Sequence, residues 1–315
     1  MKNKLLVATF LLNLINSQSA SALEEYRIAA WNIADLYHVL DEEVRPGIGT
    51  KRSQSDFDTL KKYATQIDAD VVALQEIATK EAADLLFSPA EYNVIMSSRY
   101  YEDINAGLEN DIYTAVAVRK REDIRLIEQV DLSELQIDPK SDDPKDKPTR
   151  RGTAVKLSIN GTELWILSVH LKSSCSSTKR LDLSVTNHCK ILWEQRVPLT
   201  SWIMSRIAKG EHFIIAGDFN RRFRQLEDRG VFWSYLNGGE LKNPLLLKYP
   251  KKVTRKCPTK KGNSTQPIDW IITSTSLMDS FVEGSFWETR WNFKDTQAHG
   301  RRLSDHCPIK IDMTF

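Results

Sequence analysis

The chain has 315 residues and is nearly neutral, with 44 Lys and Arg against 42 Asp and Glu. This length suits one large α/β domain with a substantial core. The charge balance counts against a protein that attracts nucleic acid through its overall charge, so any electrostatic argument must be local.

The first 22 residues have the pattern of a secretory signal peptide. Two lysines precede an apolar run from Leu5 to Ile15, and a polar stretch then ends in Ala20-Ser21-Ala22. This run is too short to span a bilayer, which takes about 20 apolar residues, and no other transmembrane segment is predicted. We therefore predict a signal peptide over 1–22, a single domain over 23–315, and export to the periplasm or the medium without stable membrane insertion. An uncleaved anchor or a core helix is the alternative.

The first half of the remaining chain alternates strand and helix patterns. Short apolar runs predict strands, and apolar residues at helical spacing predict helices. Ser53 or Ser55 is expected to cap the first helix, and residues 133–149, rich in Asp, Lys and Pro, predict an exposed loop. Strands are predicted over 26–32, 71–74, 92–96, 114–119 and 124–130, and helices over 56–67 and 79–87.

The second half continues the alternation. Asn160-Gly161, between strand patterns over 153–159 and 163–169, predicts a hairpin with a type I′ turn. Residues 221–261 predict mainly loop. A helix is predicted over 190–208, and strands over 213–216, 268–272 and 308–313. This mixture predicts an α/β layered domain with helices outside packed sheets.

Four cysteines follow the predicted signal peptide: Cys175, Cys189, Cys257 and Cys307. An exported chain with an even number of cysteines favours disulfides. Three pairings are possible. One of them would join Cys175 to Cys189 across a short loop and Cys257 to Cys307. Four free thiols are the alternative, and zinc is disfavoured because no Cys-x-x-Cys pair occurs.

Polar side chains recur where the predicted strands end or begin. If these strands share one sheet edge, their polar residues meet in one cleft. Taken singly, each has an ordinary structural explanation, such as a cap, an ion pair or an Asx turn. The ordered set indicates a site, and its members are Asn32, Glu76, His170, Asp218, Asn220, Asp269, Asp305 and His306.

The motifs around these residues resemble the endonuclease/exonuclease/phosphatase family, which includes pancreatic deoxyribonuclease, abasic-site endonucleases, neutral sphingomyelinases and inositol phosphatases. They occur in family order as WNI (31–33), LQE (74–76), SVHL (168–171), GDFN (217–220), IDW (268–270) and SDHCP (304–308). The resemblance implies a secreted bacterial-type member with a four-layered α/β sandwich, two packed mixed β-sheets flanked by helices. It also implies a hydrolytic site that uses Mg²⁺, with Mn²⁺ or Ca²⁺ as alternatives.

Phosphodiester hydrolysis gives these residues expected roles. Mg²⁺ takes hard oxygen ligands, so Asn32, Glu76 and Asp305 are the expected metal site. His306, oriented by Asp269, is the expected general base for water.

The other three site residues would act on the phosphate. Asp218 and Asn220 would hold the attacking water or a phosphate oxygen. His170 would donate to a non-bridging oxygen or protonate the leaving group. An acidic partner is expected for His170, and Asp111 is the nearest candidate by position.

Basic residues near the motifs favour a nucleic-acid substrate. The segment RRGTAVKL, which begins at Arg150, resembles a phosphate-contacting segment of deoxyribonuclease. Residues 241–261 hold eight Lys or Arg and no acid, and Arg224 lies close after GDFN. Solvated surface charge is the structural alternative. The residues expected to grip a nucleic-acid backbone are Arg150, Arg151, Arg221 and Arg222.

Three other functions compete. A lipid or inositol-phosphate phosphoesterase of the sphingomyelinase type would need apolar loops, for which Trp287 and Trp291 are candidates. The segment before Asp269 does not match the basic signature of inositol phosphatases. A nuclease-like toxin subunit would share the same core, whereas a non-enzymatic module is disfavoured because the full set of site residues is present. The sequence does not decide between DNA and RNA as the substrate, and it identifies no protein partner.

Overall fold

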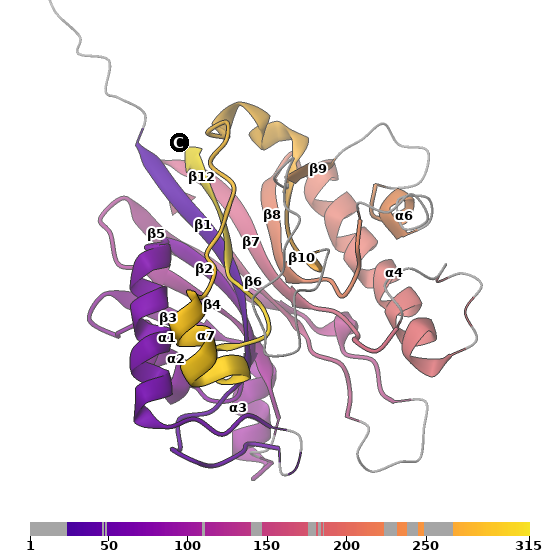
Figure 1. The fold of residues 1–315 in the computed structure, drawn as a ribbon. Helices are drawn as coiled ribbons and strands as arrows, with labels where there is room; N and C mark the ends of the chain where they lie inside the picture. The colour runs from indigo at the N-terminus through magenta and orange to yellow at the C-terminus, as the bar shows by residue number, and fades with distance from the viewer. Residues whose placement is uncertain are drawn as a thin grey trace, which may run out of the picture.

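Two six-stranded mixed β-sheets pack face to face, with helices on their outer faces (Figure 1). This is the predicted four-layered α/β sandwich. The predicted signal peptide and Cys257 lie outside the described residues. The computed structural model describes residues 24–45, 47, 49–108, 111–139, 147–175, 181, 184, 186–223, 232–237, 245–248 and 267–315.

The first sheet has the strand order β11-β12-β1-β2-β4-β3. Within it, β1 and β2 are parallel and every other neighbouring pair is antiparallel. Its strands are β1 (Glu25–Leu36), β2 (Val71–Ile77), β3 (Tyr92–Met96), β4 (Tyr113–Arg119), β11 (Trp287–Glu288) and β12 (Ile309–Thr314).

The second sheet has the strand order β5-β6-β7-β8-β10-β9. It repeats the plan of the first sheet, because β7 and β8 are parallel and the other pairs are antiparallel. Its strands are β5 (Ile124–Leu132), β6 (Gly152–Ile159), β7 (Thr162–His170), β8 (His212–Asp218), β9 (Leu245–Lys248) and β10 (Asp269–Ser274).

Helices cover both outer faces. In Figure 1, α1, α2 and α7 lie over the first sheet, and α4 and α6 over the second. No helix in the described part of the chain is both long enough and apolar enough to cross a membrane. The helices are α1 (Gln54–Ile67), α2 (Lys80–Leu86), α3 (Ser98–Asn105), α4 (Asn187–Ala208), α6 (Ser234–Leu236) and α7 (Phe293–His299), with 3-10 turns η1 (Ser133–Leu135), η3 (Thr275–Ser280) and η4 (Gly300–Leu303).

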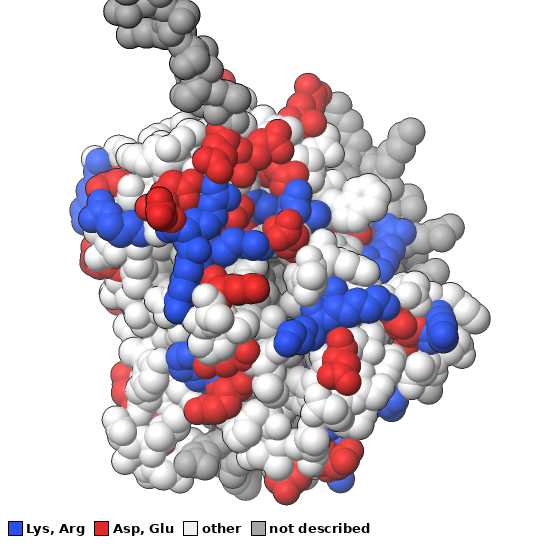
Figure 2. Space-filling view, turned by 90° about the vertical axis from the view of Figure 1, so that its left-hand side faces the viewer, with Lys and Arg blue, Asp and Glu red and all other residues white. Residues whose placement is uncertain are grey.

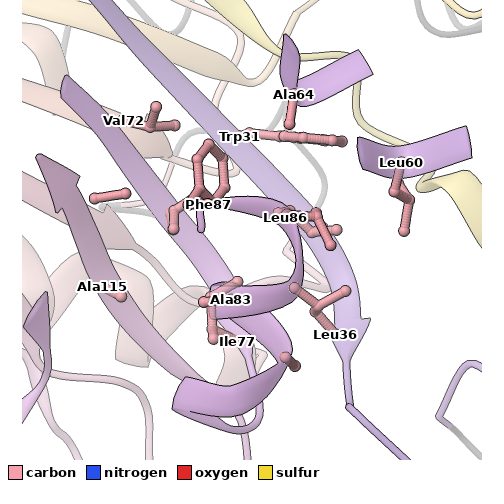
Figure 3. Packing of buried hydrophobic residues seen from close by; sticks show 14 of the residues in the cluster. Trp31, Leu36, Leu60, Ala64, Val72, Ile77, Ala83, Leu86, Phe87 and Ala115 are labelled. Atoms are coloured by element: carbon pink, nitrogen blue, oxygen red, sulfur yellow. The ribbon is translucent and has the colours of Figure 1, made fainter. Parts of the chain in front are cut away.

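The core has three apolar layers, which explains why the central strands are apolar on both faces. Trp31 of β1 packs with Leu60 and Ala64 of α1 and with Leu86 of α2 (Figure 3). Its neighbour Ala30 faces the other way, into the layer between the two sheets. A third layer joins α4 to the second sheet.

Several local predictions are confirmed. Ser53 is the N-cap of α1, and its backbone N–H donates to the Asp56 carboxylate at 2.8 Å. Asn160 and Gly161 both have positive φ, 46° and 84°, as a type I′ turn requires. Cys175 is bonded to Cys189. Cys307 is also disulfide-bonded.

Two predictions need correction. The stretch 133–149 is not uniformly exposed: Leu135 and Thr149 are buried, and the Thr149 N–H donates to Ile137 O at 3.0 Å. Residues 140–146 lie outside the described part. Trp291, considered as a membrane-facing residue, is buried in the core 4.5 Å from the Tyr63 ring, whereas Trp287 is exposed. A buried Trp291 cannot enter a lipid surface.

Charges of both signs are mixed on the face drawn in Figure 2, and neither sign forms a continuous patch there. At the amino-terminal end of β1, Arg27 pairs with Asp312, and Arg119 and Arg121 pair with Asp68 and Asp70. This face, with its charges of both signs, offers no extended basic area for a polyanion.

Candidate active site

The two parallel strand pairs end at the same edge of the sandwich. In the first sheet β1 and β2 run together, with Asn32 beside Gln75 and Glu76 one residue further on. In the second sheet β7 and β8 end with His170 beside Asp218. Since β1 and β2 pack against β7 and β8, these four ends deliver their polar side chains to one place.

Two antiparallel strands begin at this edge and complete the set. The first residue of β10, Asp269, is paired with Asp218, the last residue of β8. The strand β12 begins beside Ala30 of β1, so the preceding His306 lies at the same edge. The expected convergence of strand ends and strand starts is therefore present.

Close contact between the sheets supports this edge. Gln75 Nε2 donates to Ser168 Oγ at 2.9 Å, and that hydroxyl donates to Leu74 O at 2.9 Å. Gly217 has φ 139°, and a Cβ there would lie 2.2 Å from Val169 O and 2.7 Å from Gln75 Nε2. Only glycine allows this approach.

Asn32 bridges two carboxylates. Its Nδ2 donates to Glu76 Oε1 at 3.0 Å and lies 3.3 Å from Asp218 Oδ2. Burial acts to raise the pKa of Glu76, but the charge that His170 carries when it is protonated, the Asn32 hydrogen bond and the charge of Arg150 outweigh it and lower the pKa to about 2. Glu76 is therefore ionised throughout the neutral range, as a metal ligand needs to be.

Asp218 is held differently. Burial raises its pKa to about 7, against the opposing charge of His306, and the carboxylates of Asp269 and Glu76 act in the same direction as burial. One oxygen accepts from the Asn220 N–H at 2.8 Å. Asn220 has φ 52°, and its side chain donates to Leu171 O at 2.9 Å.

His170 has acidic neighbours other than the one expected for it, because its Nε2 lies 3.7 Å from both Glu76 Oε1 and Asp218 Oδ2. The Asp111 carboxylate instead accepts from Arg99 at 2.7 Å and from the Ile112 N–H at 2.9 Å, so the prediction of Asp111 as that partner is wrong. His170 Nδ1 is buried without a hydrogen-bond partner among the described residues. Burial lowers the pKa of His170 to about 3, and the charge of Arg150 adds to this, so the imidazole is neutral.

His306 and Asp269 form the expected pair. Nδ1 of the imidazole lies 2.8 Å from Asp269 Oδ2, and Nε2 lies 3.9 Å from Asp218 Oδ2. Burial acts to lower the pKa of His306, but the charges of Asp269 and Asp218 raise it well above its ordinary value. The His306 N–H also donates to Ser304 Oγ at 3.0 Å, which fixes the backbone.

The carboxylates at this edge fit a divalent cation. Asp218, Asp269 and His306 each offer a ligand atom, and these atoms lie within 4.8 Å of one another. Of the three expected ligands, Asn32 and Glu76 are in contact, whereas the Asp305 carboxylate lies 3.5 Å from Arg301. Hard oxygen donors of this kind suit Mg²⁺, Mn²⁺ or Ca²⁺.

The four predicted substrate arginines have different surroundings. Arg151 is paired with both oxygens of Glu102 on α3, at 2.7 Å and 2.8 Å, so its guanidinium is already engaged. The Nε atoms of Arg150 and Arg222 are buried without a hydrogen-bond partner in the described chain. Arg221 is buried, and burial lowers its pKa to about 10. Arg224 lies outside the described residues, and so do 241–261 apart from the β9 backbone.

The residues on both sides of Arg150 are anchored by hydrogen bonds. On one side Thr149 is anchored by its Oγ1, which donates to Leu135 O at 2.6 Å. On the other side Arg151 O accepts from Thr114 Oγ1 at 2.8 Å. The guanidinium of Arg150 itself has no hydrogen bond or ion pair within the described residues, yet the charge of Glu76 acts on it.

Several solved structures share the fold of this chain. The truncated TDP2 of Caenorhabditis elegans superposes with a TM-score of 0.58 and 16% identity over 92% of this chain and 98% of that one. An endonuclease/exonuclease/phosphatase from Bacteroides vulgatus gives 0.60 and 15%, over 93% and 99%. The human Nocturnin catalytic domain, with a bound sulfate anion, gives 0.57 and 16%, over 92% and 94%.

These likenesses show the fold. No curated protein sequence matches the chain significantly. The sequence model of the Endonuclease/Exonuclease/phosphatase family matches residues 29–306, nearly the whole predicted domain. The chain therefore belongs to the endonuclease/exonuclease/phosphatase family.

Proposed function

We propose that the chain is a secreted, divalent-metal-dependent phosphodiesterase that hydrolyses nucleic acid. The observation that carries this proposal is the orientation of His306. Its Nδ1 is held by Asp269, while Nε2 lies 3.9 Å from Asp218 and makes no hydrogen bond to the described residues. An imidazole fixed on one side and open on the other is suited to take a proton from water at a pH above its raised pKa, where the ring is neutral.

The reaction then runs through this chain's own side chains. His306 Nε2 removes a proton from water, the oxygen attacks phosphorus, the bond from phosphorus to the leaving oxygen breaks, and the leaving oxygen takes a proton from solvent water. Asp269 stabilises the imidazolium that forms. Glu76, Asp305 and neighbouring carboxylates would hold a divalent ion, which would supply positive charge against the phosphate oxygens.

His170 and Arg150 act on the phosphate itself. Because the pKa of His170 is lowered to about 3, its imidazole donates a hydrogen bond to a non-bridging oxygen and does not protonate the leaving group. Arg150 supplies a cation for the same anion. Asn220 and Asp218 hold the attacking water.

Nucleic acid is the substrate that the surroundings favour. Arg150 and Arg222 are only partly buried, and the Nε atom of each lacks a hydrogen-bond partner in the described chain, so neither guanidinium is fully engaged within the protein. The TDP2 of D. rerio, which has the same fold at a TM-score of 0.58 and 16% identity, has been solved with a single strand DNA product. Disulfide formation by Cys175 and Cys189 supports the export part of the proposal.

The test uses purified residues 23–315 with supercoiled plasmid, single-stranded oligonucleotides and sphingomyelin liposomes, each in Mg²⁺ and in EDTA. Nicking that depends on Mg²⁺ is expected. Hydrolysis of sphingomyelin without nicking at micromolar enzyme would replace nucleic acid by a phospholipid. No turnover of any phosphodiester would reject the enzyme assignment.

A further inference from the structure

Arg52 is a buried arginine, 1% exposed, just before α1. Its Nη1 donates to Asp35 O at 2.9 Å, and its Nη2 donates to Ile33 O at 2.7 Å and to Ala34 O at 2.8 Å. Its Nε donates to Arg302 O at 2.7 Å. A buried arginine usually pairs with a carboxylate. Within the described residues, all hydrogen bonds of Arg52 go to backbone carbonyls, so its task is to hold two backbone segments.

The first segment is an irregular end of β1. Ala34 and Asp35 have left-handed backbone, with φ 45° and 55°. The register with β2 shifts between Asn32 and Leu36. Residues other than glycine disfavour this conformation because of their Cβ atoms, so it persists only where surrounding contacts support it. Three consecutive carbonyls accept hydrogen bonds from Arg52, and these bonds provide that support.

This irregular end orients two residues of the site. The Ala34 N–H donates to Asn32 Oδ1 at 3.0 Å, which leaves the Asn32 Nδ2 to face Glu76 and Asp218. The Asp35 N–H donates to Glu76 Oε2 at 3.1 Å. Both hydrogen bonds exist because the backbone leaves regular strand geometry at residues 34 and 35.

The second segment carries the opposite half of the site. Two residues after Arg302, Ser304 Oγ donates to Asn32 O at 2.7 Å and accepts from the His306 N–H at 3.0 Å. Arg52 therefore joins the end of β1, by one side chain, to the segment that leads into His306. Burial lowers the pKa of Arg52 only to about 10, so the guanidinium keeps its charge at neutral pH.

We propose that Arg52 is a positioning residue that holds Asn32 and Glu76 in register with Ser304 and His306. It contacts neither substrate nor metal and acts through the backbone. The chemistry of the positioned groups is that of the proposed function, on which this inference rests. Replacement of Arg52 should therefore change kcat and the orientation of Asn32 and should have little effect on KM.

The test compares Arg52→Lys with a control, Arg27→Lys. Lysine keeps the charge, but one ammonium cannot reach carbonyls in both segments. Arg27 also donates to backbone carbonyls, Ile67 O and Asp68 O, and lies at the far end of β1. Arg52→Lys is expected to lower kcat about 10- to 100-fold with KM within about twofold. Arg27→Lys is expected to keep the wild-type kcat and KM.

A second readout needs no activity. In metal-free protein, the NMR signals of the Asn32 side-chain amide are expected to shift in Arg52→Lys and to stay in place in Arg27→Lys. If the wild type cleaves no phosphodiester, the proposed function fails, and the Asn32 signals alone decide the inference.

Three results would overturn the positioning role. One is an Arg52→Lys protein with wild-type kcat and wild-type Asn32 signals. Another is equal loss of thermal stability in both variants with no loss of kcat in either. The third result needs only the wild type, so it applies even if Arg52→Lys does not fold. It is rapid hydrogen exchange at the amides of Ala34 and Asp35, because the irregular end of β1 should protect these amides if Arg52 supports it.

Discussion

Asp269 holds the imidazole of His306 through both carboxylate oxygens, which lie 3.0 Å and 2.8 Å from Nδ1. This geometry fixes the ring so that Nε2 faces the acidic centre. Asp269→Asn is expected to lower kcat by about 10⁴-fold. The asparagine amide would favour the wrong tautomer of the His306 imidazole and would stabilise its protonated form less than the carboxylate does. Steady-state nicking assays measure the loss. Asp279→Asn, an exposed aspartate on η3, is the matched control. A near-normal rate for Asp269→Asn would move the base to another residue.

Metal dependence is expected to centre on Glu76. Activity should disappear in EDTA and return with Mg²⁺. Glu76→Ala should lose at least ~100-fold in kcat, about 2.7 kcal/mol of transition-state stabilisation. Glu91→Ala, on the exposed turn before β3, should be unchanged. Full activity of the wild type in chelator would refute this prediction.

Arg150 and Arg151 are neighbours with different expected effects on DNA binding. Arg150 has no ion pair in the described chain, whereas Arg151 is engaged by Glu102. Arg150→Ala should make the log–log salt dependence of affinity shallower by about 0.9 for each phosphate that Arg150 neutralises, on any duplex sequence. Arg151→Ala should change the slope little. Fluorescence anisotropy over a salt series measures both, and equal slopes for the two variants would contradict the assignment.

Asp56 is expected to make stability depend on pH. It is buried, and its carboxylate accepts from the Ser53 N–H at 2.8 Å and from Arg302 Nε at 2.9 Å. Burial acts to raise the pKa of Asp56, but these hydrogen bonds and that of His299 lower it overall. A lowered folded-state pKa stabilises the protein above the unfolded value, near 4, and this contribution is lost as pH falls through the folded value.

Asp56→Asn should therefore cost about 3 kcal/mol of unfolding free energy at neutral pH. The difference from the wild type should narrow as the pH is lowered below about 4. Guanidinium unfolding curves at a series of pH values measure it. A difference that stays constant with pH would show that the carboxylate charge is not what stabilises the fold.

Much of this architecture could be predicted from local sequence patterns. The strand Tyr92–Met96 and the hairpin around Asn160-Gly161 follow from apolar spacing and turn chemistry, which act over a few residues. The short helices α3 and α7 are not predicted by such patterns. Only Arg99 and Tyr100 of α3 are buried, and only Thr296 of α7, so neither helix has an apolar stripe that a sequence pattern could reveal.

Some residues of the site could also be predicted from the sequence, whereas the contacts that support them could not. Residues at strand ends, such as Glu76 and Asp218, could be identified because motif order and strand position both mark them. The supporting contacts could not. Arg52 bonds to Arg302, 250 positions away, and Arg99 binds the carboxylate that was expected to pair with His170. Such pairings depend on how distant segments pack, and no local spacing records them.

The position of β12 has a consequence for biosynthesis. This strand pairs with β1, at the opposite end of the chain, and His306 precedes it directly. A ribosome-bound chain that lacks β12 holds Glu76, His170 and Asp218 but has no anchored His306. Synthesis of β12 therefore completes the site, and a nascent chain that stops before this strand is expected to lack the assembled pair of His306 and Asp269.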